Sequence, residues 1–170
     1  DLKATQRPFS SWKMGQVAEP TCCSAVKGVR TIMTDKRILI VEDEFIVALN
    51  LRQIMSNMGF DVIGIAPDAA TADQLAQRKP DIALVDLNLR DGPTGPQIGA
   101  KLSQEHGTTV LFLTANASQL RDGVKGTIGV VSKPVDEQAI GTVLDFLVKH
   151  RVGEPASPPP SLRLFPNTLN

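Results

Sequence analysis

Residues 38–43 read ILIVED, four aliphatic residues followed directly by two carboxylates. An apolar run without alternation is typical of a strand that helices cover on both faces. The same pattern returns at residues 82–86, which read IALVD. The two stretches therefore predict buried parallel strands that each lead into an acidic side chain.

Three more largely aliphatic runs complete the predicted sheet, at residues 62–65, 110–113 and 128–131. Strand patterns that alternate with helical patterns are typical of repeated strand–helix units around a parallel sheet. The sequence thus predicts an α/β fold with a doubly wound, five-stranded parallel sheet.

The segments between these runs carry the apolar spacing of helices, most clearly at residues 47–58 and 140–147. Weaker patterns cover residues 69–78, where Asp68 can cap the first turn, and residues 96–104. Between the last two strands the pattern is poor and two glycines stand close together, so a short or mobile fourth helix is expected there.

The chain divides into a central domain at residues 36–151 and two flanking segments. Residues 1–35 lack any apolar period, so we expect a flexible extension, and Met33 is a candidate for the natural start. Residues 152–170 are rich in proline, which favours an extended tail without packing. The alternative for this tail is a docking motif built on its apolar residues Leu162, Leu164 and Phe165.

Composition excludes several classes of function. With 42% hydrophobic residues the chain can bury a core, and 18 basic residues balance 18 acidic ones, so nothing attracts nucleic acid or anionic lipid. No apolar run approaches the roughly 18 residues that cross a bilayer. Cys22 and Cys23 are adjacent instead of spread through the fold as in secreted scaffolds. We expect a cytoplasmic protein that binds neither membrane nor nucleic acid.

Polar side chains follow four of the predicted strands. Glu42 and Asp43 follow the first, Asp86 the third, Thr114 the fourth and Lys133 the fifth. Each taken alone has a structural explanation, such as a helix cap or a surface charge, but Asp86 would be partly buried, where an unpaired carboxylate is costly. Because the carboxyl ends of parallel strands meet at one edge, we expect these side chains to form one pocket.

Carboxylates gathered in this way need a cation. Two charges about 4 Å apart repel by about 4 kcal/mol at an effective dielectric near 20, so Glu42, Asp43 and Asp86 do not all ionise comfortably unaided. Mg²⁺ suits the set, because it takes one or two carboxylates, several waters and a phosphate oxygen. We predict Asp43 and Asp86 as direct ligands, Asp86 as a nucleophile, and Thr114 and Lys133 as groups that contact a transferring phosphoryl group.

The motifs at residues 41–44, 84–89, 113–116 and 132–134 resemble, in order and approximate spacing, those of the receiver domain of two-component response regulators. The resemblance implies a flavodoxin-like fold with strand order 2-1-3-4-5. It also implies that Asp86 is the phosphorylated aspartate, that Asp43 and the backbone carbonyl of Asn88 bind Mg²⁺ with Asp86, and that Glu42 acts through a metal-bound water.

The resemblance further implies that Thr114 and Lys133 sense and neutralise the phosphoryl group, and that the Lys133–Pro134 bond is cis. The sequence departs from the family at Val130, where an aromatic or histidine usually reports phosphorylation. It also has Arg90 where proline is common and a reduced segment before Lys133. These departures leave the switching mechanism open.

The resemblance implies a stand-alone response regulator, not an enzyme, that takes its phosphoryl group from a histidine kinase or phosphotransfer protein and signals to a downstream protein as a monomer or weak dimer. One alternative is a constitutive interaction module with a residual acceptor site, which the residue at Val130 favours. A flavin or nucleotide carrier is a third possibility, but it would need a Ser/Thr/Gly-rich phosphate cradle where Glu42, Asp43 and Glu44 stand.

Overall fold

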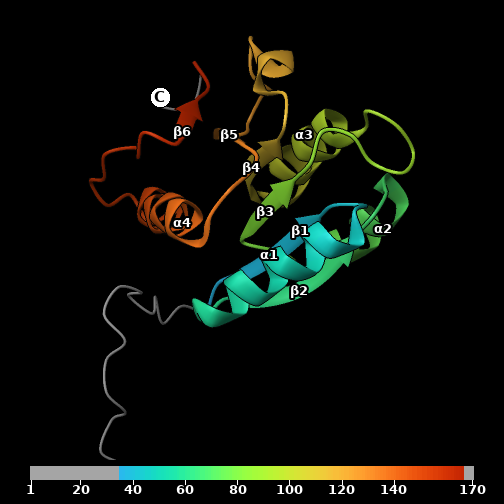
Figure 1. Cartoon of the computed structure of the whole chain (residues 1–170), viewed down its shortest axis with the longest axis horizontal. Coiled ribbons are helices and arrows are strands. Elements are labelled where there is room, and N and C mark those ends of the chain that lie inside the picture. The colour runs from blue at the N-terminus through green and yellow to red at the C-terminus, as the bar shows by residue number, and fades with distance from the viewer. Residues whose placement is uncertain (1–34, 167–170) are drawn as a thin grey trace, which may run out of the picture.

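The computed structural model describes residues 35–166, which form one sheet with helices on both faces (Figure 1). The predicted extension at residues 1–35 lies outside the described part except for Asp35. The strands are β1 (Arg37–Val41), β2 (Asp61–Ala66), β3 (Ile82–Val85), β4 (Thr109–Thr114), β5 (Gly129–Ser132) and β6 (Leu162–Leu164). The helices are α1 (Phe45–Asn57), α2 (Ala69–Ala76), α3 (Gly95–His106), the 3₁₀ helix η1 (Ala117–Leu120) and α4 (Glu137–Arg151).

The strand order is β2-β1-β3-β4-β5-β6, and the first five strands are parallel. The predicted α/β fold and the order 2-1-3-4-5 are therefore confirmed. The sheet has one strand more than predicted, because β6 pairs antiparallel with the outer edge of β5. The expectation of an unpacked tail is wrong at residues 162–165: the prolines at 158–160 lie before the strand, and Leu162 and Phe165 beyond them are buried.

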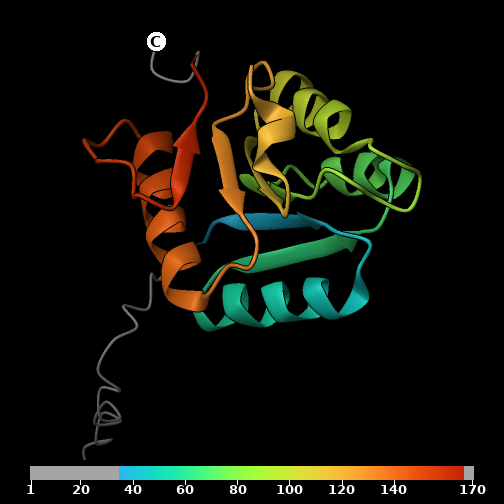
Figure 2. The same cartoon turned by 45° about the horizontal axis from the view of Figure 1, so that its top comes forward.

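The sheet separates two apolar cores because successive strand residues face opposite sides. Helices α1 and α4 cover one face, where Ile38 and Ile40 of β1 are buried, and α2 and α3 cover the other, where Leu39 and Val41 are buried (Figure 2). This layering is why the central residues of the parallel strands are almost continuously apolar.

Local sequence signals mark the start of α2 and the end of α3. The Asp68 side chain accepts a hydrogen bond from Thr71 N at 2.9 Å and so caps α2, as predicted. Helix α3 ends at Gly107, whose φ of 62° suits glycine.

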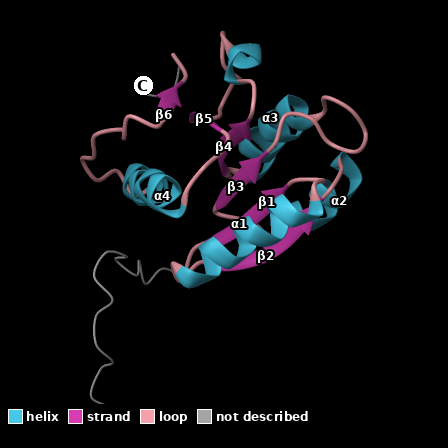
Figure 3. Ribbon diagram, viewed as in Figure 1, coloured by secondary structure: helices cyan, strands magenta, loops and turns pink. Residues whose placement is uncertain are grey.

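Between β4 and β5 the described chain forms only the single-turn η1, as the ribbon coloured by secondary structure shows (Figure 3). This agrees with the predicted short fourth helix. Across residues 35–166, no helix combines the length and apolar character needed to span a bilayer.

Candidate functional site

The predicted site residues lie at the carboxyl ends of neighbouring strands. Parallel pairing aligns these ends: Asp86 N donates to Val41 O at 2.9 Å, which fixes the start of the loop after β3 beside the end of β1. Lys133 N donates to Thr114 O at 2.8 Å and fixes the end of β5 beside that of β4. Four strand ends thus contribute to one edge of the sheet.

An ionic cluster occupies this edge. Lys133 Nζ lies 2.6 Å from Glu42 Oε2 and 2.9 Å from Asp86 Oδ2. The side chain of Glu42 is 3% exposed, that of Asp86 15% and that of Lys133 21%. The sequence prediction of convergence is therefore correct for Glu42, Asp86 and Lys133, which are called the trio below.

Backbone N–H groups hold the remaining carboxylate oxygens. Glu42 Oε1 accepts from Glu44 N at 3.2 Å, and Asp86 Oδ1 accepts from Leu87 N at 2.6 Å. Each carboxylate therefore has one oxygen on a backbone amide and the other on the ammonium of Lys133. The orientation of both acids is fixed by these contacts.

The electrostatics of the trio are unbalanced, because two carboxylates face one ammonium. Burial raises the pKa of Glu42, and the hydrogen bond and charge of Lys133 only partly oppose this. Burial acts to lower the pKa of Lys133, but its hydrogen bonds to Glu42 and Asp86 and the charges of these two carboxylates together outweigh burial and raise it. Lys133 thus stays protonated, and the site still favours an additional cation.

Thr114 lies beside the cluster, and its hydroxyl makes a hydrogen bond to the backbone instead of to the cluster. The residue is 1% exposed, and its Oγ1 accepts from Asn116 N at 3.1 Å. Its backbone carbonyl holds Lys133, as given above. The hydroxyl is therefore positioned at the strand end and engaged with the chain that leads into η1.

The predicted metal ligands are less closely gathered than the trio. Asp43 and Asn88 are exposed, on the loops that follow β1 and β3. Within the part of the chain that the structure describes, no three His, Cys, Asp or Glu side chains are grouped to hold a metal ion. The donor chemistry still fits Mg²⁺, since carboxylate and carbonyl oxygens are its preferred ligands and water completes its shell. The ligand set remains a prediction.

The loop between β3 and α3 contains a residue that the sequence reasoning missed. Asp91 accepts hydrogen bonds from Ala69 N at 3.0 Å and from Thr94 Oγ1 at 2.7 Å, and hydrogen bonds from these two residues lower its pKa. Two backbone hydrogen bonds between Leu89 and Gly92 close the turn. The clue was available, because an aspartate three residues before a threonine at a helix start is a common local pattern.

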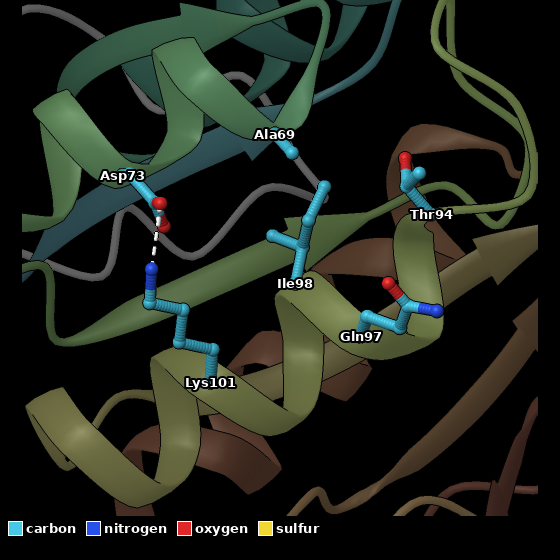
Figure 4. A pocket seen from close by; sticks show the side chains of 6 residues that line it. All are labelled: Ala69, Asp73, Thr94, Gln97, Ile98 and Lys101. Carbon is cyan, nitrogen blue, oxygen red and sulfur yellow. Dashed lines mark hydrogen bonds and ion pairs between the residues drawn. The ribbon is translucent and has the colours of Figure 1, made fainter.

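A small cavity lies next to this loop, between α2 and α3 (Figure 4). Thr94, Gln97 and Ile98 line it from the α3 side, and Lys101 bridges across it to Asp73 at 2.6 Å. None of these residues belongs to the ionic cluster, so the cavity is separate from the candidate site.

Comparison with protein families matches residues 38–145 to the response regulator receiver domain. Among curated proteins, the phyllosphere-induced regulator PhyR of Methylorubrum extorquens is 28% identical over 110 residues, which cover 63% of this chain and 41% of that protein. The transcriptional regulatory protein PdtaR of Mycobacterium tuberculosis is 35% identical over 60 residues, 34% of this chain and 29% of that protein. The chain spans less than half the length of these relatives.

Solved structures agree with this match. The PhyR receiver (REC) domain of Erythrobacter litoralis is 25% identical, with a TM-score of 0.60 over 75% of this chain and 97% of that one. The response regulator PhyR of Brucella abortus is 27% identical, with a TM-score of 0.58 over 71% of this chain and 52% of that one. The similarity therefore concerns the receiver portion of these proteins.

Proposed function

The chain belongs to the response regulator receiver domain family, whose members are signalling proteins, and from that premise we propose that Asp86 accepts a phosphoryl group in two-component signalling. The donor is a histidine kinase or a phosphotransfer protein. In the transfer, the bond between phosphorus and the donor nitrogen breaks, and a bond forms between phosphorus and an Asp86 carboxylate oxygen. The product is an acyl phosphate.

The observation that carries this proposal is the bridging position of Lys133. Its ammonium contacts Asp86 Oδ2, the oxygen that is not held by a backbone amide, and Asp86 remains 15% exposed. The Asp86 side chain is therefore partly open to a donor, and the Lys133 ammonium beside it can contact the oxygens of a transferred phosphoryl group. Electrostatic stabilisation of this kind is the main protein contribution to phosphoryl transfer.

Mg²⁺ would be held by Asp43, Asp86 and the backbone carbonyl of Asn88, with Glu42 acting through water, and would neutralise charge on the phosphoryl oxygens. Glu42 meanwhile holds Lys133 at 2.6 Å, so it sets the position of the ammonium next to the acceptor. Thr114 supplies a hydroxyl at the neighbouring strand end, which can turn from Asn116 N to donate to a phosphoryl oxygen.

Radioactive phosphotransfer from a panel of histidine kinases tests the proposal. Asp86→Asn should abolish labelling, whereas Asp73→Asn, which removes an exposed carboxylate of α2, should leave it unchanged. Equal labelling of wild type and Asp86→Asn would reject Asp86 as the acceptor. Loss of labelling in both variants would show that the assay reports folding instead of the acceptor.

A constitutive interaction module remains the second candidate, because one observation favours it. Val130 stands at the position of the usual aromatic reporter and has no ring that could rotate. It is 1% exposed and pairs with Arg163 of β6. Beryllofluoride with Mg²⁺, which mimics a phosphoryl group, separates the two: unchanged amide spectra would favour the constitutive module. Changes around Asp86, Thr114 and Lys133 would favour the acceptor.

A further inference from the structure

The outer edge of β5 is covered by the chain's own C-terminal segment. Leu162, Arg163 and Leu164 pair with residues 129–131, and Phe165 N donates to Ile128 O at 3.0 Å. The connection from Val152 to Ser161 is exposed except at Pro159. The tail is therefore attached to the body mainly through residues 162–165.

The body of the domain is shaped to receive this strand. A Cβ atom on Gly129 would lie 2.3 Å from the backbone oxygen of Arg163, so β6 can approach only because residue 129 is glycine. The ring of Phe165 fills the space beside Gly123 and lies 6.2 Å from the ring of Phe112. Gly123 has a φ of 74°, which by itself favours glycine, whereas Gly129 has no positive φ, so its lack of a side chain is explained by the close approach of β6.

A continuous set of contacts links the strand to the candidate site. Arg163 Nη2 donates to Ala117 O at 2.6 Å and to Leu120 O at 3.1 Å, so its guanidinium holds both ends of η1. Helix η1 follows Asn116, whose N–H is the group held by Thr114 Oγ1. If the Thr114 hydroxyl turns toward a phosphoryl oxygen, it releases the Asn116 amide. The start of η1 is then less restrained, and with it the Ala117 and Leu120 carbonyl groups that Arg163 binds.

We propose that the β5 edge is a strand-docking surface, occupied by residues 162–165 in the unphosphorylated protein and opened by phosphorylation to an extended segment of a partner protein. The partner segment carries the chemistry of the segment it replaces: two aliphatic residues flanking a basic residue, followed by an aromatic one. Addition of a strand to a free sheet edge is an established mode of recognition, in which the backbone gives affinity and side-chain pockets give specificity. This inference rests on the proposed phosphorylation of Asp86.

Two full-length variants separate docking from folding. Gly129→Ala places a methyl group against β6 and should prevent this strand from docking. Because the φ of Gly129 is not positive, the rest of the domain should tolerate alanine there. Arg163→Ala combined with Phe165→Ala weakens the tail and leaves the β5 edge intact. Gly141→Ala in α4 is the control, because its Cβ would meet only the flexible end of Met58.

Hydrogen–deuterium exchange with Mg²⁺, before and after adding beryllofluoride, tests the release. In wild type and Gly141→Ala, exchange in residues 117–120 and 162–165 should rise when beryllofluoride is added; in Gly129→Ala, exchange in 162–165 should already be high. Protection of Asp86 and Lys133 with no change in the tail would overturn this inference and leave the proposed function standing. No change anywhere in wild type would count against the proposed function itself.

Binding of a fluorescein-labelled peptide of residues 157–166 tests the surface. A tethered strand competes at an effective concentration of about millimolar. The Arg163→Ala, Phe165→Ala double variant should therefore bind the peptide at least about tenfold more tightly than wild type. Beryllofluoride should raise wild-type affinity toward that of the double variant, and Gly129→Ala should not bind. Equal affinity in all variants, or binding in none, would overturn the proposal.

Discussion

The two ends of the sheet hold similar charged residues in opposite proportions. At the amino ends of the strands, Asp81 accepts from Arg37 N at 3.0 Å and faces two guanidinium groups, with Arg151 Nη2 at 3.4 Å and Arg37 Nε at 4.0 Å. At the carboxyl ends, one ammonium faces two carboxylates. One end therefore has excess positive charge on its ion cluster, and the other has excess negative charge.

This difference separates a structural cluster from a reactive one. Arg151 Nη1 also donates to Gly107 O and to Thr109 Oγ1, both at 3.0 Å, so the cluster at the amino ends ties the last helix to the sheet. In the trio at the carboxyl ends, the Asp86 Oδ2 atom contacts the Lys133 ammonium, and the Asp86 side chain remains 15% exposed. Similar residue types thus stabilise the fold at one end and surround the proposed acceptor Asp86 at the other.

Removing the ammonium should have the largest effect. In metal-free buffer, Lys133→Met leaves the buried Glu42 and the part-buried Asp86 without a cation, and we expect the free energy of unfolding to fall by about 2–4 kcal/mol in urea titrations. Lys101→Met breaks an exposed ion pair of the same 2.6 Å length and should cost much less, because water screens it. Equal losses would show that the trio behaves as an ordinary surface cluster.

Breaking the cluster at the amino ends should reduce stability without touching function. Asp81→Asn removes the charge between Arg37 and Arg151, and we expect a loss of about 1–2 kcal/mol in the free energy of unfolding. Phosphoryl labelling of the folded variant should match wild type. A slower labelling rate at full folding would mean that the two ends of the sheet are not independent.

Metal binding sharpens the comparison at the carboxyl ends. Mg²⁺ should raise the melting temperature of wild type, and Asp43→Asn should weaken Mg²⁺ affinity at least about tenfold, or about 1.4 kcal/mol, because it removes a carboxylate ligand. Glu44→Gln is the matched control, since Glu44 is the next exposed acid and makes no side-chain cap bond to α1. If both variants bind Mg²⁺ equally, Asp43 is not a ligand.

The smallest effect should come from Asp68, whose carboxylate is held by a hydrogen bond from Thr71 and not by a buried cation. Hydrogen bonds from Thr71 lower the pKa of Asp68 below its ordinary 3.8. The ionised group therefore stabilises the fold above pH 3.8, and this contribution disappears as the pH falls through the lowered value. Asp68→Asn keeps the cap acceptor, so the stability difference from wild type should shrink over that range in acid titrations. A difference independent of pH would contradict this assignment.

The sequence was most informative where burial dictates residue type. Continuous apolar runs such as residues 38–41 and 82–85 require a covered sheet, and the polar residues that follow them must then meet at one edge. This reasoning predicted the five parallel strands and the convergence of Glu42, Asp86 and Lys133, which the structure confirms.

The rest depends on contacts that spacing does not encode. Strand β6 has three residues, and its docking relies on the room at Gly129, which becomes visible only when both strands are in place. The sequence also could not show which of the successive acids Glu42 and Asp43 would contact Lys133, nor that Asp91 would accept a hydrogen bond from the distant Ala69 N. Local periodicity carries no information about such long-range partners.

A crystal structure with Mg²⁺ and beryllofluoride tests the central claim most directly. The account predicts beryllofluoride on a carboxylate oxygen of Asp86, contacted by Lys133 and Thr114, with Mg²⁺ bound to Asp43, Asp86 and the carbonyl of Asn88. Beryllofluoride on another residue, or Mg²⁺ bound away from Asp86, would contradict it.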